Sequence, residues 1–376
     1  MNKEEFYNEL LKLAPSEYGK SEHEFPKHLK MQFDKYVELL DDLEEPEKEV
    51  LDNFKMTWDE IKGKINVLIS KIIETINLYY KGYHYEAFSK IKEQIEDIVN
   101  KSLASMCSCN NTNSFYRMRV FKGNEERYPK SMFHIPFNMR TKVTTQRYSA
   151  PGYPCLYLGK SVYVCWEEMQ RPHLDECYVS KFQLQESITM LNLVLPDIKL
   201  WTDETTEIYK KCSKETFLYD LLRFPLVIAC MVKVAKPEDP FKPEYIIPQL
   251  LMEWLIEENK PQKGIMGIAY TSVHKSHDFK FPQAKLTNYV IPAFLPATKD
   301  DDYSKELCSL FHVTKPTCDE LERAKRPYHL NWEWEDMESD EEREHNYQIS
   351  TFGHLEKRLD DFQPVSIVDI PQEQEF

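Results

Sequence analysis

Three residues of different chemistry follow one another at regular spacing near the middle of the chain. Arg147, Tyr157 and Glu168 are ten and then eleven residues apart. A guanidinium can hold a pyrophosphate through paired hydrogen bonds, and a phenol ring can stack on a flat heterocycle. A carboxylate can bind ribose hydroxyls beside a bond that breaks with positive charge building up on the sugar. Together these residue types meet the needs of NAD cleavage.

The first residue of this set lies in a segment that predicts a strand. Residues 142–149 are rich in valine and threonine and alternate, so Arg147 and Ser149 would point to one face of the strand. Pro151 and Gly152 then predict a turn.

The other two residues lie in a predicted strand and helix. Residues 155–158 predict a short strand in which Cys155 and Tyr157 share a face. Ser161 is a suitable N-cap for a helix that starts at Val162. The apolar stripe of that helix consists of Val162, Cys165, Trp166 and Met169.

The same helix carries two neighbouring glutamates, which the helical period separates. Glu168 lies about 110° from the centre of the apolar stripe, whereas Glu167 lies about 150° away. We therefore expect Glu167 to face water and Glu168 to lie at the edge of the buried face. A glutamate at the edge of a helix is, taken alone, more often a residue with no role than a site residue.

These motifs resemble the RES-domain toxins, a bacterial family with a strand arginine, a following glycine and tyrosine, and a helix glutamate. FYR at residues 115–117 is similar to the opening of that domain, QRYSAPG to its arginine segment, and PCLYLG to its second strand. Glu168 matches the family's acid. GIAYTS is similar to a later segment, in which Ser272 matches the family's serine. The resemblance covers about residues 114–296, and a helical segment precedes it, as in longer family members.

The resemblance implies an α+β fold, in which a helical N-terminal domain precedes an ADP-ribosyltransferase-like core of two packed antiparallel sheets with flanking helices. It implies a toxin-like enzyme that splits the nicotinamide–ribose bond of NAD, by phosphorolysis or hydrolysis, and so depletes cellular NAD. Inorganic phosphate is a candidate co-substrate, and no other cofactor is expected. An antitoxin or regulatory partner, a homo-oligomer and a role in phage defence are further implications.

The resemblance also assigns roles to single residues. Arg147, Tyr157 and Glu168 would be catalytic. The residues that bind NAD would be Arg117, Arg119, Ser149 and Ser272. The arginine that opens the site could be either Arg117 or Arg119. Two other functions stay open at this point: a protein ADP-ribosyltransferase and a non-catalytic helical interaction protein.

The composition is that of a globular protein with an acidic surface. The 376 residues include 41% hydrophobic and 13% aromatic residues, which suffices for a buried core. A net charge of −15 argues against nucleic acid as the main partner, because a phosphate backbone requires a basic surface. The chain has 9 glycines and lacks both glycine-rich phosphate-binding motifs, so side chains would have to hold NAD.

The cysteines and the N-terminal sequence indicate a reduced, cytoplasmic setting. There are 9 cysteines, an odd number without framework spacing, and the start MNKEEFYNEL resembles no leader peptide. The cysteines and histidine of residues 308–318 lack the paired spacing of a zinc site, so no metal is expected. The apolar run at residues 224–232 is too short to span a bilayer and predicts a buried strand.

The pattern along the chain predicts four parts. Residues 1–105 predict a helical N-terminal domain, 106–114 a polar linker, 115–297 the catalytic domain and 298–376 an acidic C-terminal extension. The extension includes the charged run 331–344, which predicts a solvated or disordered segment. As a hypothesis, this run could bind and inhibit the protein's own arginine-lined cleft, which a truncation at Ala297 would test.

Three smaller predictions concern the catalytic part. Residues 179–193 predict an edge-type strand, because apolar and polar residues alternate. Residues 248–258 predict an amphipathic helix, and Gln249 in its first turn is expected to meet water. His134 is expected to be a hydrogen-bonded core residue rather than a site residue.

Overall fold

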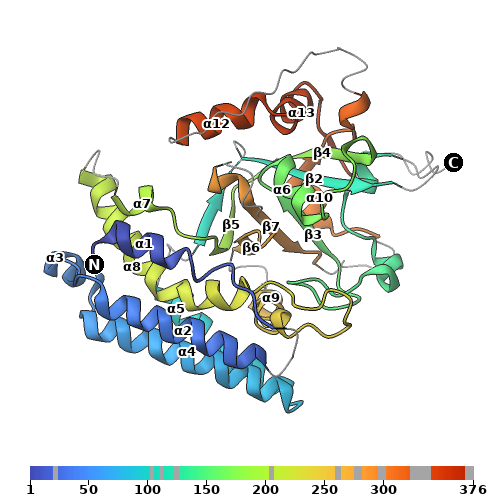
Figure 1. Cartoon of the computed structure of the whole chain (residues 1–376). Coiled ribbons are helices and arrows are strands. Elements are labelled where there is room, and N and C mark those ends of the chain that lie inside the picture. Colours follow the sequence, from blue (N-terminus) through green and yellow to red (C-terminus); the bar gives the residue numbers. More distant parts are fainter. Residues whose placement is uncertain are drawn as a thin grey trace. The chain divides into compact units, whose positions relative to one another are not determined.

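Figure 1 shows a computed structural model of the chain. The structure describes residues 1–19, 24–101, 106–110, 113–121, 127–202, 207–258, 264–274, 282–294, 302–321 and 340–368. Its contacts divide the chain into two compact units, each built from separate stretches of sequence. The helical unit consists of Met1–Cys107, Thr145–Ala150 and Met190–Val273, and the sheet unit of Ser108–Thr144, Pro151–Thr189 and His274–Phe376. Helices and strands together make an α+β protein, which confirms the predicted class.

Most of the helices belong to the helical unit. From the N-terminal part of the chain come α1 (Lys3–Leu10), α2 (Glu24–Asp42), α3 (Lys48–Phe54), α4 (Trp58–Tyr80) and α5 (His84–Lys101). From later parts come α7 (Ile198–Thr202), α8 (Glu207–Cys230) and α9 (Ile246–Glu258). The strand β6 (Ile265–Thr271) neighbours β5 (Ile188–Leu193), and β1 (Met106–Cys109) lies where a linker was predicted.

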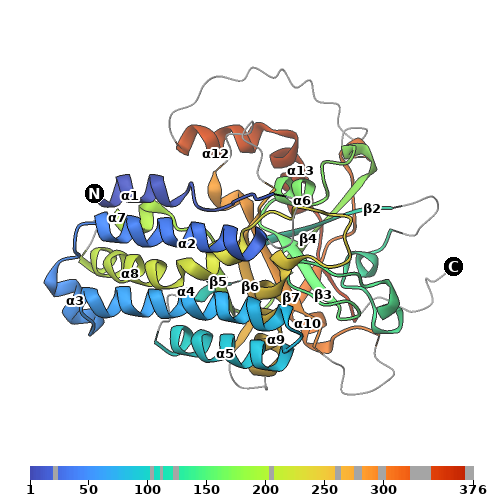
Figure 2. The same ribbon diagram turned by 60° about the horizontal axis from the view of Figure 1, so that its bottom comes forward.

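Helix α4 forms the centre of the N-terminal helices because one of its faces is apolar at helical spacing. Ile61, Ile65, Leu68 and Ile72 on that face are buried. A capping box between Thr57 and Glu60 fixes its first turn. The helix packs against α2, α5 and α8, and Figure 2 shows these four helices side by side.

The predicted strand at residues 224–232 is wrong, because most of this run is the last part of α8. The helix contacts α2, α4, α7 and α9 and is buried on all sides over this stretch, and an apolar run alone does not distinguish a buried helix from a strand. Pro225 lies within the helix and cannot donate to the carbonyl of Leu221. The hydroxyl of Tyr36 donates to that carbonyl instead, at 2.7 Å, so no buried acceptor is left unpaired there.

Six strands of the described sheet unit form one antiparallel sheet in the order β7-β3-β2-β4-β8-β9. These are β2 (Ser114–Val120), β3 (Cys155–Gly159), β4 (Cys177–Leu184), β7 (Thr287–Pro292), β8 (Phe311–Val313) and β9 (Val365–Ser366). The helices of the unit are α6 (Val162–Glu168), α10 (Lys305–Leu310), α12 (Asp340–Ile349) and α13 (Thr351–Asp360). In the described part of this unit the strands form a single sheet, so the expected second packed sheet is not found there, and α6 and α13 pack against one face.

The core of the sheet unit lies between β2 and the helices α6 and α13. Tyr116 and Met118 of β2 pack against Val162 of α6 and against Phe352 and Leu355 of α13. The predicted acidic extension therefore supplies two strands and part of the core of this unit. Residues 331–339 of the predicted charge run lie outside the described residues, and Asp340–Ile349 is helical.

Two strand predictions need correction. Residues 142–149 do not form a strand, because Gln146 and Ser149 pair with each other across a tight turn that holds Arg147 and Tyr148. Residues 179–193 contain parts of two strands, β4 and β5, rather than one edge strand, and β4 lies inside the sheet between β2 and β8. The predicted helix at residues 248–258 is confirmed as α9.

The helices that the structure describes are each too short or too polar to cross a lipid bilayer.

Candidate functional site

Helix α6 lies directly on strand β3, as the sequence predicts. Ser161 is the N-cap and accepts a hydrogen bond from the backbone N–H of Val164 at 3.1 Å. Gly159, at the end of β3, permits the close approach. A Cβ atom at this position would lie 2.6 Å from Sγ of Cys165 and 2.6 Å from Cγ1 of Val164. Because glycine has no side chain, α6 can lie this close to the sheet.

Glu168, the last residue of α6, is half-buried and bound to the sheet. The side-chain amide of Asn288 donates a hydrogen bond to Oε1 of Glu168 at 2.7 Å. Asn288 lies on β7, directly opposite Gly159 of β3, and is only 4% exposed. The sequence analysis did not find Asn288. Its only signal is a polar amide in a strand that is mostly apolar, Thr287–Pro292.

The prediction that Glu167 faces water is wrong, since its side chain is only 3% exposed. Arg171 donates from Nε and Nη2 to the two carboxylate oxygens of Glu167, both at 3.0 Å. Gln170 and Arg171 have φ angles of 62° and 57°, so the chain reverses directly after the helix. This reversal returns the guanidinium to Glu167 and gives this glutamate a structural partner.

Tyr157 and Arg117 meet across β3 and β2. Nη1 of Arg117 donates to the backbone carbonyl of Tyr157 at 3.2 Å. Burial, followed by the neighbouring charge of Arg119, lowers the pKa of Arg117 to about 10. The guanidinium is still protonated at neutral pH, but it lies where a bound anion would offset its loss of hydration.

Tyr157 and Asn288 also share one face of the sheet. Tyr157 pairs with Val290, and Gly159 pairs with Asn288, so side chains two positions apart on β3 and β7 point the same way. The buried thiol of Cys165 lies within electrostatic range of Arg117 and Glu168. Its pKa is raised to about 12, mainly by burial, and the charges of these two residues act on it in opposite directions. Arg117 thus contacts the backbone of the strand that carries Tyr157, and Glu168 is bound to the strand on the other side of β3. Because Tyr116 of β2 faces α6, the neighbouring Arg117 side chain points to the opposite face of the sheet.

A cavity of about 440 Å³, here called the cationic pocket, opens beside β2. Its described lining includes Arg117, Arg119, Lys130 and Lys142 and contains no carboxylate. Arg119 is exposed and donates to the carbonyl of Ser131 at 2.9 Å. Since four basic side chains surround the space, the pocket favours a ligand group with negative charge.

His134 lines the same pocket but is fixed as a core residue, which confirms the prediction for it. Its Nε2 accepts the backbone N–H of Ser304 at 3.0 Å, so Nδ1 carries the proton and donates to the carbonyl of Ile135 at 2.8 Å. Burial is the main cause that lowers the pKa of His134 to about 4. The imidazole is therefore neutral near pH 7 and adds no charge to the pocket.

Three of the predicted site residues lie in the helical unit instead. Nη1 of Arg147 donates to the carbonyls of Cys230 at 2.9 Å and Val232 at 3.0 Å, and its guanidinium lies over the ring of Tyr245. Arg147 thus binds the carbonyl end of α8. Ser149 and Ser272 are both buried in this unit. The predicted roles of these three residues in binding and catalysis stay predictions.

The prediction that Gln249 meets water is wrong. Its side-chain amide donates to Oγ1 of Thr145 at 3.0 Å and to the carbonyl of Gln146 at 2.9 Å. Gln249 therefore ties the first turn of α9 to the turn that carries Arg147. Both partners belong to the helical unit, so this contact belongs to the scaffold around Arg147.

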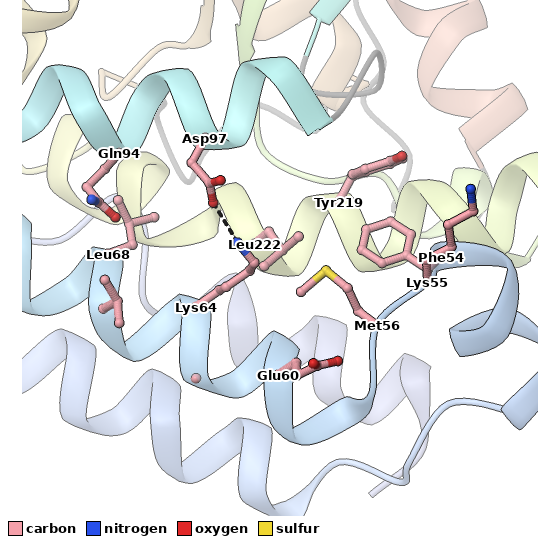
Figure 3. A pocket seen from close by; sticks show the side chains of 12 residues that line it. Phe54, Lys55, Met56, Glu60, Lys64, Leu68, Gln94, Asp97, Tyr219 and Leu222 are labelled. Atoms are coloured by element: carbon pink, nitrogen blue, oxygen red, sulfur yellow. Dashed lines mark hydrogen bonds and ion pairs between the residues drawn. The ribbon is translucent and has the colours of Figure 1, made fainter.

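A larger cavity of about 920 Å³ lies in the helical unit between α4, α5 and α8 (Figure 3). Phe54, Met56 and Leu222 form its apolar walls, and an ion pair of 2.6 Å joins Lys64 to Asp97 across it. None of the predicted site residues lines this cavity. Its larger size therefore does not make it the better candidate for the predicted chemistry. In the part of the chain that the structure describes, no group of acidic, histidine or cysteine side chains could hold a metal ion.

Comparison with known proteins gives one informative relative. The "Putative toxin YopC" of Bacillus subtilis (strain 168) is 31% identical over 345 residues, which span 86% of this chain and 74% of that protein. No family model matches the chain, and no solved structure matches it. At this identity and coverage, the chain belongs to the same family as YopC.

Proposed function

We propose that this chain is a toxin of the RES-domain type, which cleaves the nicotinamide–ribose bond of NAD. The motifs around Arg147, Tyr157 and Glu168 support the RES assignment by resemblance. The relative of 31% identity, whose name includes the word toxin, supports a toxic activity. An enzyme that drains NAD from its own cell needs an inhibitor, so an antitoxin partner is part of the proposal.

One observation carries the proposal: Arg117 connects the cationic pocket to the strand that carries Tyr157. Its guanidinium lines the pocket and also donates to the carbonyl of Tyr157. Glu168 is bound to Asn288 on the adjacent strand β7. Positive charges beside the strand that carries Tyr157, and a carboxylate bound to the next strand, match a substrate that carries phosphates at one point and a reacting ribose at another.

The proposed mechanism needs only one carboxylate. When the bond between C1′ of the ribose and nicotinamide breaks, its electron pair goes to the ring nitrogen, which is already cationic and leaves neutral. Glu168 would bind the ribose hydroxyls and stabilise the positive charge that develops on the sugar. Tyr157 would pack on the nicotinamide or its ribose, and Arg117 with the cationic pocket would bind phosphate groups. An unprotonated phosphate oxygen then bonds to C1′, or a water oxygen does so and releases one proton to solvent.

The first prediction tests this assignment with Glu168→Gln. The glutamine keeps an oxygen that can accept from Asn288 but removes the negative charge, so the fold should persist while turnover falls by at least about 100-fold. Purified protein is incubated with NAD, with and without phosphate, and the products are followed by proton and phosphorus NMR. ADP-ribose phosphate identifies phosphate as the acceptor, ADP-ribose identifies water, and label on protein identifies a transferase.

Glu176→Gln is the matched control, because Glu176 is exposed in the same unit and undergoes the same chemical change. It should retain wild-type turnover. A Glu168→Gln protein as active as the wild type would refute the assignment of Glu168. A wild-type protein that consumes no NAD and labels no protein would refute the proposed function itself.

A further inference from the structure

We propose that Asn288 is the positioning residue for the carboxylate of Glu168. This inference rests on the proposed function and adds a residue to which no motif points. Asn288 would not touch the reacting atoms as an acid or base. It would act through Glu168, by holding one carboxylate oxygen in place while the substrate binds.

The position of Asn288 suits this role because its own backbone is held within the sheet. It lies near the start of β7, and β7 pairs with β3 over five residue pairs from Cys155 to Gly159. Its side chain is 4% exposed, so a lost hydrogen bond could not be replaced freely by bulk water. An amide N–H at 2.7 Å can donate only to an oxygen that accepts.

Glu168 needs such a partner because of its place on α6. This helix has seven residues and ends at Glu168, where the following residue is the C-cap and the chain then reverses. A glutamate side chain has several rotatable bonds, and ordering it costs about 1.5–2 kcal/mol. The hydrogen bond from Asn288 restricts the carboxylate before the substrate binds. Less side-chain entropy is therefore lost when the substrate binds.

The geometry that brings the two residues together also depends on Gly159. Gly159 pairs with Asn288 across β3 and β7 and lies beneath α6, where it contacts Val164 and Cys165. The helix can therefore approach the sheet closely enough for its last residue to reach β7. Three separate segments of the sheet unit thus fix one carboxylate: the end of β3, the end of α6 and the start of β7.

The second prediction uses Asn288→Ala and Asn288→Asp. Alanine removes the donor, and kcat should fall about tenfold or more, with KM within about threefold of the wild type. Aspartate has nearly the same shape but places a second carboxylate beside Glu168. Two carboxylates this close cannot both stay ionised without repulsion, so one keeps its proton to higher pH. The acid limb of the kcat profile should move upward by about one pH unit or more.

Asn113→Asp provides the matched control. Asn113 is also in the sheet unit, and its side-chain oxygen accepts the backbone N–H of Asn110, which an aspartate can do equally well. Its kcat and pH profile should equal those of the wild type. Circular dichroism and urea unfolding of each variant show whether it is folded. These measurements separate a loss of fold from a loss of positioning.

Side-chain amide NMR tests the contact without any need for turnover. The resonances of the Asn288 amide should titrate with pH in the wild type and lose that titration in Glu168→Gln. If the amide does not respond to Glu168, or if Asn288→Asp keeps the wild-type kcat and pH profile, the inference is overturned. A wild type that shows this titration but no NAD cleavage would instead overturn the proposed function and leave the contact established.

Discussion

The burial of His134 makes the stability of the fold depend on pH. Both ring nitrogens are hydrogen-bonded and the residue is 1% exposed, so the fold selects the neutral imidazole. Its pKa of about 4 in the folded protein lies below the value of about 6.5 in an unfolded chain. Between these values the unfolded state binds more protons, so stability rises with pH and is lost as the pH falls towards 4.

The third prediction follows from this difference in protonation. The stability that His134 contributes should be complete above about pH 6.5 and should decline on acidification by an amount of order 3 kcal/mol. The ring protons of His134, followed by NMR, should titrate near pH 4, while the thermal midpoint falls over the same range. A His134 ring that titrates near pH 6.5 would contradict the buried, neutral state described here.

Among the site residues, the sequence could predict those set by short-range geometry. The N-cap at Ser161 and the position of Glu168 at the edge of its helix follow from local spacing alone, and both are confirmed. The burial of Glu167 could not be predicted, because it depends on Arg171 returning after two residues with positive φ. Asn288 could not be predicted either, since it lies 120 residues away from Glu168.

At the scale of elements, the contact between α6 and β3 has no room for an added methyl group. The fourth prediction is therefore that Gly159→Ala destabilises the sheet unit by about 1–3 kcal/mol, because Cys165 and Val164 must move. The helix should move away from the sheet, so the hydrogen bond between Glu168 and Asn288 should weaken and turnover should fall. Urea unfolding measures the first effect, and the Asn288 amide resonances measure the second.

Gly63→Ala is the control for this substitution. Gly63 lies within α4, and a Cβ atom there would meet nothing within 4 Å. Alanine is the better helix former, so this variant should be more stable by about 0.5–1 kcal/mol. If Gly159→Ala were as stable as the wild type, α6 and β3 would not be in the close contact described.

Elements were predicted well where the pattern is amphipathic and poorly where it is apolar throughout. The buried face of α4 and the shared face of β3 follow from helical and alternating spacing. The run at residues 224–232 has no polar face, so only its packing in α8 decides that it is helical. Residues 142–149 alternate like a strand. Tyr148 is nevertheless fully buried and Arg147 binds the end of α8, and both contacts are made from a turn.

At the scale of the whole molecule, the composition predicted a buried core and the family resemblance implied an α+β fold, but the order of the sequence did not reveal the two units. Residues Thr145–Ala150 join the helical unit although their neighbours on both sides join the sheet unit. The acidic C-terminal part adds β8 to β4 and adds α13 to the core. The many charged residues of the C-terminal part predicted a solvated tail. That prediction counted the charges and missed the apolar residues between them that pack into the core.

The C-terminal part also holds α6 at its first turn. Oε1 of Glu356 in α13 accepts the backbone N–H of Val162 at 2.8 Å and a hydrogen bond from the hydroxyl of Tyr347. Burial raises the pKa of Glu356, whereas these two hydrogen bonds lower it. A carboxylate that binds one of the first free N–H groups of a helix stabilises that end of the helix. The segment that follows residue 340 therefore supports the helix that carries Glu168.

The fifth prediction is that truncation at Ala297 unfolds the sheet unit rather than activating the protein. The deletion removes α10, β8, α12, α13 and β9, and it exposes Phe182, Tyr116 and Met118, which are buried in the full chain. An inhibitory tail would instead leave a folded and more active protein. Circular dichroism, size-exclusion chromatography and NAD turnover distinguish the two outcomes. Truncation after Val368 is the control, because it keeps every described C-terminal element and should behave as the wild type.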